Sequence, residues 1–515
     1  MLKERIRQFK PPVMLCLAFL LAALFLLIGS KSSPLYPMND WVDVNVFMTL
    51  GRGILHGKVP YRDLFEQKGP FLFFWHALSA LFIRRGYGGV WLSEILTVGL
   101  FLYYCARITG LYVKNRLAPI LIMMILGVGV TVSPAFSMGG GLEELFLFAF
   151  PLSLFYLLRG MREKRPLSFR ESFVIGLMAG IGFWTKYTFC GFFAALALAV
   201  VIWYASSRLI GSLYKTAGQM ILGLLAVTLP ILLYFALNGA LDDLFHVYFL
   251  QNIRDYARTE KSALEYIKSG LQLTYKRNLW NYNWLLWPGA AFLLFGLYRH
   301  WRETLAVLLS FAGLAVTTYM SSPGYIYYGL SFAPYALCGL VGIAWLAEKI
   351  LTARLSRGTS APPVRIPKSA RILLGFGLPI LAGVGMAVIG VFSSNTYLMK
   401  FKKEDMPQYQ FAEIIQEKED ATLLNYWFLD GGFYYASGVE PVNKYFCYFN
   451  LNPPELKTDQ EDLIRSGGVD FVVTRRNPLP NRLLNDSSYE LVAQSNFFFS
   501  TRYYDYYLYR LKESP

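Results

Sequence analysis

The sequence has little charge and few of the residues that build soluble metal or redox sites. Only 16% of its 515 residues are Asp, Glu, Lys or Arg, whereas a soluble domain would carry about a quarter. The chain has five cysteines and four histidines, and neither a CxxC nor an HxxxH spacing occurs. Nothing in the sequence therefore indicates a disulfide framework or a structural zinc site.

Nucleotide-binding and serine-hydrolase signatures are also absent from the sequence. The chain contains no GxxxxGK, GxGxxG or GxSxG pattern, which mark phosphate-binding loops, dinucleotide-binding turns and nucleophile elbows. A soluble nucleotide would have no recognisable binding fold here. We therefore expect an activated donor, if the chain uses one, to arrive through the membrane.

Long apolar runs dominate the sequence instead. Hydrophobic residues make up 55% of the chain and aromatic residues 17%, and the mean hydropathy is +0.37. Runs near the ~20 residues that cross a bilayer as a helix recur along the chain, so we predict an all-α polytopic membrane protein. The expected spans, about eleven in number, are 13–30, 90–106, 117–135, 144–158, 172–186, 189–205, 217–238, 283–298, 304–320, 329–347 and 372–393.

The positive charge of the chain follows its expected topology. The net charge is +15, and the Lys and Arg residues gather in short loops between apolar runs, as they do in cytoplasmic loops. This distribution argues against a nucleic-acid partner. The same distribution predicts a cytoplasmic N-terminus, which is followed by an uncleaved first helix. It also predicts that residues 69–83 form an interfacial or re-entrant helix and do not cross the membrane. The basic loops are 107–116, 159–170, 208–215, 299–302 and 349–371.

Two domains are expected in this multi-pass protein of the cell membrane. Residues 1–393 form the transmembrane domain, whose first outer loop, 31–89, carries interfacial helices and the active site. Residues 394–515 form a small α/β domain on the extracytoplasmic side. Its predicted strands are 423–427, 471–474 and 506–511, and its predicted helices are 408–418 and 459–466.

The first outer loop offers a candidate catalytic acid. Asp43 follows the first span, where a carboxylate can remove a proton from an acceptor hydroxyl. The alternative is a solvated loop acid, or the N-cap of a helix over 44–56. Asp40 is a rival for the same role, although its place beside Asn39 is typical of a turn.

Further along the same loop, a charged cluster precedes the interfacial helix. Arg62 and Asp63 open this cluster, and Lys68 stands at the entry of the helix. Lys68 can bind a phosphate as a point charge, or it can simply extend its ammonium group toward the membrane interface.

Four more candidates come from later parts of the chain. Glu143 and Glu144 lie at the outer end of an apolar span and can serve as a second acid or a cation ligand, or as acids favoured at a helix N-terminus. Lys186, in a tight turn between two spans, can hold a lipid phosphate or extend to the interface. Tyr328 can donate its hydroxyl to a phosphate or a sugar, or it can belong to an aromatic belt.

An ordered set of residues in the first outer loop matches a known pattern. The set is Asp43, Phe47, Gly57, then Pro-Tyr-Arg-Asp over 60–63, and Glu-Gln-Lys-Gly-Pro over 66–70. It resembles the GT-C superfamily of polyprenyl-phosphate-sugar glycosyltransferases, in particular the branch of protein O-mannosyltransferases and the lipid A aminoarabinose transferase. The resemblance covers about 1–393.

The resemblance implies roles for the candidate residues. Asp43 matches the family's catalytic acid, and Glu144 or Glu143 falls where members keep an acid in the second outer loop. Lys68 matches the lysine of a Lys-Pro-Pro-like motif, although a glycine replaces the first proline here. Lys186 and Tyr328 match positions near the lipid phosphate.

The activity implied is an inverting sugar transfer on the outer face of the membrane. The donor would be a polyprenyl-phosphate-linked sugar, and the acceptor a hydroxyl of a cell-envelope glycan, lipid or protein. The resemblance requires no cofactor and allows a divalent cation. Two other functions remain open: a transporter or lipid flippase whose acids couple to ions, and a scaffold whose outer domain binds cell-wall polymers.

Overall fold

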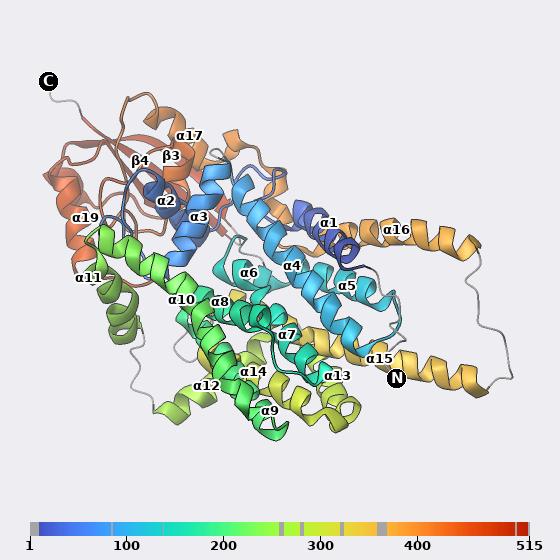
Figure 1. Cartoon of the computed structure of the whole chain (residues 1–515). Coiled ribbons are helices and arrows are strands. Elements are labelled where there is room, and N and C mark those ends of the chain that lie inside the picture. The colour runs from blue at the N-terminus through green and yellow to red at the C-terminus, as the bar shows by residue number, and fades with distance from the viewer. Residues whose placement is uncertain are drawn as a thin grey trace. The chain divides into compact units, whose positions relative to one another are not determined.

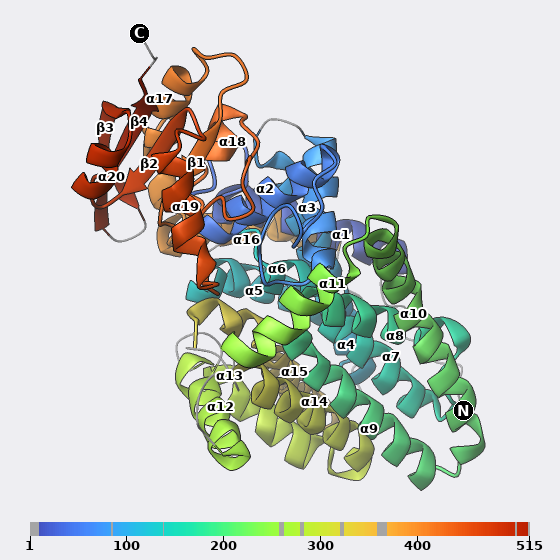
Figure 2. The ribbon, with the colours of Figure 1, turned by 90° about the vertical axis from the view of Figure 1, so that its left-hand side faces the viewer.

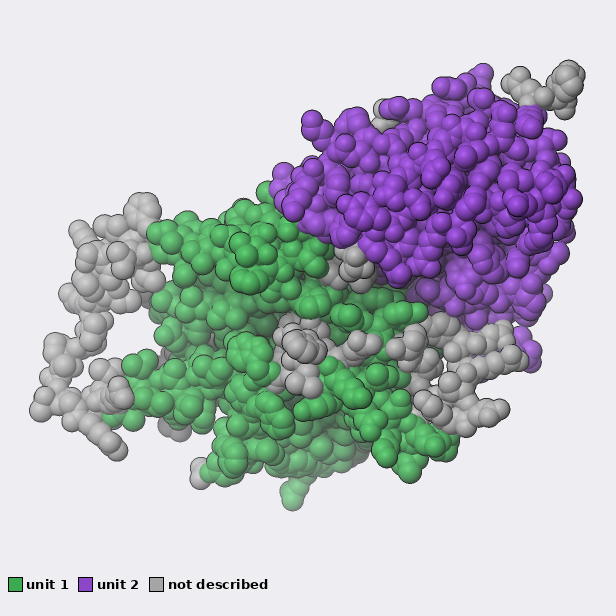
Figure 3. All heavy atoms as spheres, turned by 180° about the vertical axis from the view of Figure 1, so that it is seen from behind, with its two compact units in different colours: residues 1–30, 91–228, 259–396 green, residues 31–90, 229–258, 397–515 purple. Residues whose placement is uncertain are grey.

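The computed structural model describes residues 10–83, 86–136, 139–256, 262–278, 283–319, 324–357, 368–499 and 502–512. The chain divides into two compact units, each assembled from three separate stretches (Figure 3). Unit 1 comprises Met1–Ser30, Trp91–Thr228 and Thr259–Thr396. Unit 2 comprises Lys31–Val90, Leu229–Arg258 and Tyr397–Pro515. The first outer loop and the C-terminal segment thus belong to the same unit, whereas the predicted division after residue 393 stays a prediction.

Among its described residues, unit 1 contains helices and no β-strand (Figure 1). Its α-helices, two of which extend into unit 2, are α1 (Pro11–Gly29), α4 (Gly88–Tyr112), α5 (Ala118–Val132), α6 (Leu142–Phe146), α7 (Ala149–Glu163), α8 (Phe169–Thr185), α9 (Cys190–Ser206), α10 (Leu213–Leu237), α12 (Ala263–Asn278), α13 (Asn283–Ala291), α14 (Trp301–Tyr319), α15 (Ala333–Arg357) and α16 (Lys368–Phe392). Shorter 3-10 and π turns are η1 (Pro134–Phe136), η2 (Tyr187–Phe189), η3 (Ile210–Ser212), η5 (Phe292–Gly296), η6 (Tyr298–His300) and η7 (Ile326–Phe332).

These helices agree with a polytopic membrane protein. Within the described residues, six helical segments are long and apolar enough to cross a bilayer. They are Pro11–Gly29, Gly88–Tyr112, Leu142–Glu163, Tyr187–Ser206, Ile210–Leu237 and Ile326–Ala353. Every predicted span falls on a helix of the structure, but the full number of crossings and their orientation stay predictions.

Glycines allow the helices of unit 1 to approach one another closely. A Cβ atom at Gly176 of α8 would lie 1.9 Å from the carbonyl oxygen of Met220 in α10, and one at Gly223 would lie 2.1 Å from that of Phe173. No side chain fits these gaps. Small residues at helix contacts let backbones pack tightly where the lipid supplies no hydrophobic force between helices.

Unit 2 combines two helices of the first outer loop with the C-terminal segment. Its helices are α2 (Val42–Leu55), α3 (Pro70–Phe82), α11 (Leu241–Leu244), η4 (Phe245–Tyr256), η8 (Thr396–Lys400), η9 (Lys403–Asp405), α17 (Pro407–Ile415), α18 (Phe433–Ser437), α19 (Glu455–Arg465) and α20 (Asn481–Asp486). Helices α2 and α3 cross closely at Gly51, where a Cβ would lie 2.6 Å from the backbone nitrogen of Ala77. Helix α3 confirms a helix at 69–83, and its place at the membrane interface stays a prediction.

A four-stranded mixed sheet forms the centre of the C-terminal segment (Figure 2). The strands are β1 (Leu423–Asn425), β2 (Phe471–Arg475), β3 (Tyr489–Phe499) and β4 (Arg502–Leu511), in the spatial order β1-β2-β4-β3. β1 pairs with β2 in parallel, and the other pairs are antiparallel. The predicted strands at 423–427, 471–474 and 506–511 are confirmed, as are helices near 408–418 and 459–466.

Strand β3 is absent from the sequence-based prediction. Its middle carries Gln494, Ser495 and Asn496, which weaken the apolar alternation by which a strand is recognised. Its pairing with β4 supplies the stability that its sequence does not show.

Candidate functional site

Asp43 lies in the first turn of helix α2, the second residue of Val42–Leu55, and is 8% exposed. The N-cap of this helix is Trp41, and no side chain caps it. Asp43 is therefore neither a solvated loop acid nor an N-cap, which excludes both alternatives raised by the sequence. The partial positive charge at the helix N-terminus favours a carboxylate at this position.

The segment before α2 is held in place by buried polar contacts. Lys31 Nζ lies 2.6 Å from Asp40 Oδ1, with both side chains almost fully buried, and the hydroxyl of Tyr397 donates to the same carboxylate. Asn45 Nδ2 donates to the carbonyl oxygen of Trp41 at 2.9 Å. Asp40 is thus committed to an ion pair that fixes the approach to α2, which leaves Asp43 as the candidate base.

Three acids of unit 2 act electrostatically on one buried cysteine. Burial raises the pKa of the Cys447 thiol well above its ordinary value, and the nearby carboxylates of Asp430, Glu66 and Asp43 add to this shift. The Cys447 thiol therefore responds to carboxylates from three segments: Asp43 of α2, Glu66 of the first outer loop and Asp430 of the C-terminal segment.

Asp430 is an acid that sequence reasoning missed. It is fully buried, and its carboxylate accepts hydrogen bonds from Thr49 Oγ1 at 2.7 Å, from the Gly432 N–H at 2.9 Å and from Asn425 Nδ2 at 3.2 Å. Its contact with Thr49 ties the C-terminal segment to α2. No local pattern marks Asp430, because its neighbourhood depends on a residue 381 positions away.

The pKa of Asp430 predicts a pH dependence of stability. Burial raises this pKa from 3.8 to about 6, so the folded state binds the proton more tightly than the unfolded state. The resulting stabilisation is complete below pH ~4 and is lost as the pH rises through about 6, by on the order of 3 kcal/mol. We expect Asp430→Asn to remove this part of the decline in the free energy of unfolding between pH 4 and 7.

Thermal unfolding of the purified protein in detergent, measured at several pH values, checks this expectation. The quantity to compare is the change of melting temperature with pH in each protein. The melting temperatures themselves also differ for another reason, because the substitution changes the hydrogen bonds of the side chain. Parallel slopes for wild type and Asp430→Asn would contradict the prediction.

The charged cluster of the first outer loop consists of two separate ion pairs, Arg62 with Asp63 and Lys68 with Glu66. Arg62 donates to both oxygens of Asp63 at 2.9 Å, and to the Asn238 carbonyl oxygen at 2.7 Å. This pair is partly exposed and satisfies its own charges, so it closes the loop and offers little to a ligand. Lys68 Nζ lies 3.4 Å from Glu66 Oε1, and both side chains are largely buried. The structure thus places Lys68, unlike Arg62, beside Glu66 in a largely buried position.

Unit 1 holds a second group of predicted residues. Lys186 Nζ lies 2.7 Å from Glu143 Oε1, both side chains being less than 10% exposed, and 3.2 Å from the ring centroid of Tyr328. Glu143 Oε2 is buried and has no hydrogen-bond partner among the described residues. An ammonium group, an aromatic face and an unsatisfied carboxylate oxygen therefore meet at one point, as expected of a site that receives a polar ligand.

Glu144 lies beside Glu94, a residue that was not predicted from the sequence. Its carboxylate accepts from the N–H groups of Gly139 at 3.2 Å and Gly141 at 3.1 Å, and it lies beside the fully buried carboxyl group of Glu94. Glu94 itself accepts from the Gly140 N–H at 2.7 Å. Gly139 and Gly140 have φ of 74°, a conformation that favours glycine.

Glu94 and Glu144 act together on this glycine segment. Between them, the two carboxylates accept the N–H groups of three successive glycines, Gly139, Gly140 and Gly141. A lone acid within an apolar helix is the signal that could have pointed to Glu94. The structure makes Glu144 a residue that shapes the backbone next to Glu143, and Glu143 the acid that contacts Lys186.

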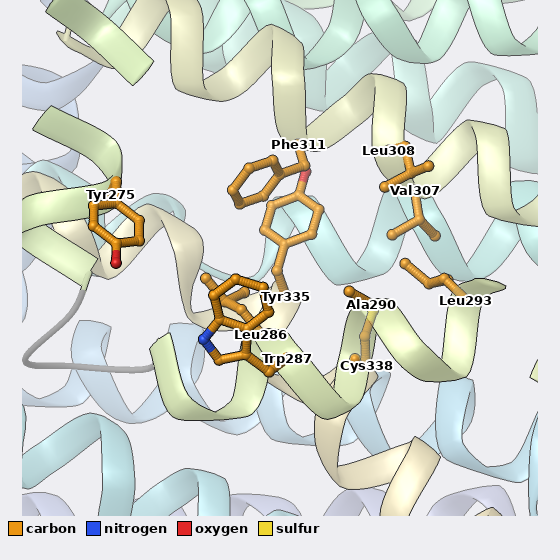
Figure 4. A pocket seen from close by; sticks show the side chains of 11 residues that line it. Tyr275, Leu286, Trp287, Ala290, Leu293, Val307, Leu308, Phe311, Tyr335 and Cys338 are labelled. Atoms are coloured by element: carbon orange, nitrogen blue, oxygen red, sulfur yellow. The ribbon is translucent and has the colours of Figure 1, made fainter. Parts of the chain in front are cut away.

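An apolar cavity of about 250 Å³ opens elsewhere in unit 1 (Figure 4). It lies among α12, α13, η5, α14 and α15. Leu286, Trp287, Leu293, Phe311 and Tyr335 are among its lining side chains. Such a cavity suits a flexible hydrocarbon ligand.

The part of the chain that the structure describes contains no group of three or more His, Cys, Asp or Glu side chains arranged to hold a metal ion. The expectation that the site requires no cofactor but allows a divalent cation stays a prediction.

Comparison with solved structures identifies the fold. ArnT from Cupriavidus metallidurans, bound to undecaprenyl phosphate, matches with a TM-score of 0.57 at 14% identity, over 95% of this chain and 97% of that chain. The apo state of the same protein matches with a TM-score of 0.59 at 15% identity over the same shares. The chain has the fold of ArnT.

The likeness to ArnT concerns the fold, and it agrees with the architecture expected from the motif in the first outer loop. Both chains have the architecture of a polytopic helical protein with a small C-terminal mixed sheet. By sequence, no family model and no curated protein matches the chain. The likeness is thus carried by the tertiary structure and by the short loop motif.

Proposed function

We propose that the chain is an integral membrane glycosyltransferase that moves a sugar from a polyprenyl phosphate to a hydroxyl acceptor on the extracytoplasmic face. The observation that carries this proposal is the buried carboxylate of Asp43, at the N-terminus of α2 in the ArnT fold. A buried carboxylate in this position, in the same unit as the Glu66–Lys68 pair and the buried Asp430, is difficult to explain as a support for the fold alone.

The proposed donor is consistent with two features of the chain. The related fold of ArnT binds undecaprenyl phosphate, a lipid with a long isoprenoid chain and one phosphate. The apolar cavity lined by Trp287 and Phe311 offers room for part of an isoprenoid chain. For the phosphate, the candidates are Lys68 in unit 2 and Lys186 in unit 1.

The proposed reaction is a single displacement at the anomeric carbon. Asp43 accepts the proton of the acceptor hydroxyl while the hydroxyl oxygen bonds to the anomeric carbon from the side opposite the phosphate. The bond between that carbon and the phosphate oxygen breaks, and the polyprenyl phosphate leaves with the bonding electron pair. Since phosphate is already a good leaving group, positive charge from a lysine stabilises it without protonation.

The acceptor in this proposal is a hydroxyl of a cell-envelope glycan, lipid or protein. In unit 1, Glu143 Oε2 is a buried acceptor atom without a partner among the described residues, and a sugar or acceptor hydroxyl could donate to it. The N-terminus is cytoplasmic and the C-terminal segment extracytoplasmic in this proposal, in agreement with the distribution of Lys and Arg.

An ion-coupled transporter or flippase is the second candidate, and one observation favours it. Glu94 and Glu144 form a buried carboxyl pair in helices that are candidates to span the membrane, and intramembrane acids are typical of proton and ion pathways. Such a protein would translocate its lipid without breaking the bond between sugar and phosphate.

The release of polyprenyl phosphate distinguishes the two candidates. The purified full chain is reconstituted in vesicles with polyprenyl-phosphate-linked mannose, glucose, galactose or aminoarabinose, together with a membrane extract as the source of acceptor. We expect free polyprenyl phosphate to accumulate with at least one donor, in step with label transferred to the extract. Movement of the intact donor between leaflets, with no release from any donor, would instead establish the transporter.

A further inference from the structure

Three arginines converge on one tyrosine in the C-terminal sheet. The guanidinium carbons of Arg475, Arg476 and Arg502 lie 5.1, 5.0 and 5.4 Å from the ring centroid of Tyr504. Arg476 also donates to the Tyr504 hydroxyl at 3.2 Å. The three positive charges consequently lie within about one Debye length of one another at physiological ionic strength.

The three charges have no ion-pair partner in the part of the chain that the structure describes. Among the described residues, none of the three arginines has an acidic side chain within ion-pair distance, whereas Arg465, Arg482 and Arg510 of the same domain all do. The nearest acid along β4, Asp505, points to the opposite face of the strand, because successive residues alternate, and it accepts from Asn496 at 2.8 Å.

The sheet register places these residues together. Arg475 at the end of β2 pairs with Tyr506 of β4. Arg502 and Tyr504 lie four and two residues before Tyr506, so their side chains are on the same face of the strand as that of Tyr506. Figure 2 shows β2 between β1 and β4 in this sheet. The sequence separation between the two strands explains why no linear motif reveals the group.

Arg476 is held in an unfavourable backbone conformation. Its φ is 73°, in the left-handed region that a long side chain rarely adopts. The Arg476 N–H donates to the Asp505 carbonyl oxygen at 2.7 Å, which fixes this conformation and directs the guanidinium group onto the ring. Backbone strain of this kind concentrates at ligand-binding positions.

The positive charge of the three arginines also lowers the pKa of Tyr504. Burial would raise the pKa of Tyr504, but the hydrogen bond from Arg476 and the positive charges of the three arginines hold it below its ordinary value. Arg476 and Arg502 are exposed to solvent, so an anion can reach them. Three uncompensated like charges repel one another, and a bound anion would relieve that repulsion.

We propose that Arg475, Arg476, Arg502 and Tyr504 form a binding site for a phosphate ester. Guanidinium groups match phosphate oxygens with two parallel hydrogen bonds each, and the tyrosine hydroxyl supplies one more donor. Two sources present such a group at the outer face of a membrane: the headgroup of an anionic lipid and an anionic polymer of the cell envelope. The proposal does not depend on the transferase activity.

Binding of two phosphate esters by the full chain in neutral detergent micelles tests this site. The probes are a soluble glycerol phosphate oligomer and phosphatidylglycerol mixed into the micelles. The variants are Arg476→Gln with Arg502→Gln, and, as a matched control on the same strand, Arg510→Gln, whose exposed side chain lies 3.9 Å from Glu490. We expect the double variant to bind at least one probe about tenfold or more weakly, and the control to bind both as wild type does.

Each outcome has a defined meaning. Loss of oligomer binding alone assigns the site to a polymer, loss of phosphatidylglycerol binding alone assigns it to the lipid headgroup, and loss of both supports a general phosphate site. Unchanged binding of both probes, or an equal loss in Arg510→Gln, would overturn the proposal. A melting temperature equal to that of wild type shows that the double variant is folded, and since both substituted side chains are exposed, we expect this result.

Discussion

Replacing Asp43 by Asn is expected to lower the rate of sugar transfer by about 10²–10⁴-fold, the usual contribution of a general base. An amide of the same shape keeps the contacts of the side chain but cannot accept a proton from the acceptor hydroxyl. The loss should therefore appear in kcat more than in KM. The release of polyprenyl phosphate from reconstituted vesicles is the measurement.

The matched control for this substitution is Asp242→Asn, an exposed acid of the same unit at the start of α11. We expect the control to retain wild-type activity, and both variants to melt near the wild-type temperature. Equal transfer by wild type and Asp43→Asn would exclude Asp43 as the base while leaving the enzyme established. The next candidates would then be Glu66 and Asp430, which share its surroundings.

Replacing Lys186 by Met is expected to destabilise the protein by about 3–5 kcal/mol, because it leaves the carboxylate of Glu143 buried without its partner. The pair is separated by 2.7 Å and almost fully buried. If the second partner is also replaced, as in Lys186→Met with Glu143→Met, most of the stability should return, because an apolar pair of similar volume often replaces a buried ion pair without loss. The free energy of unfolding in detergent is the measurement.

Lys418→Met provides the contrast for this prediction. Its ion pair with Asp470 is more than half exposed on the lysine side, so we expect a change below about 1 kcal/mol. A small effect of Lys186→Met would show that the ammonium group is not required to balance Glu143. The double variant also tests the pair as a whole: a stable protein without transfer activity shows that the pair serves the transfer, and a stable, active protein limits both residues to the structure.

The membrane part of the fold could be predicted because its signal is local. Each apolar run long enough to span a bilayer forms a helix, from α1 to α16, since in lipid the backbone must satisfy its own hydrogen bonds. The loop motif around Asp43 and Lys68 pointed to the fold for a similar reason, because its residues lie close together in the sequence.

The candidate site could be predicted only in part. Lys186, Glu143 and Tyr328 were each suggested by their types and positions, and the structure places them in contact. Arg62 and Asp63 were suggested on the same grounds, yet they satisfy each other. A charged residue in a loop has the same appearance in the sequence whether it faces a ligand or a neighbour.

The sequence by itself determined the class of protein, the positions of its helices and the segment that carries Asp43, because hydrophobic length and short spacings act within a few turns of chain. Only the tertiary structure decided which polar groups meet. Asp430 reaches Thr49 across 381 residues, Glu94 reaches the Gly140 backbone, and Arg475 reaches Tyr504 through the register of two strands. These contacts exist because burying a polar group requires a partner, and that partner is chosen by the packing of distant elements.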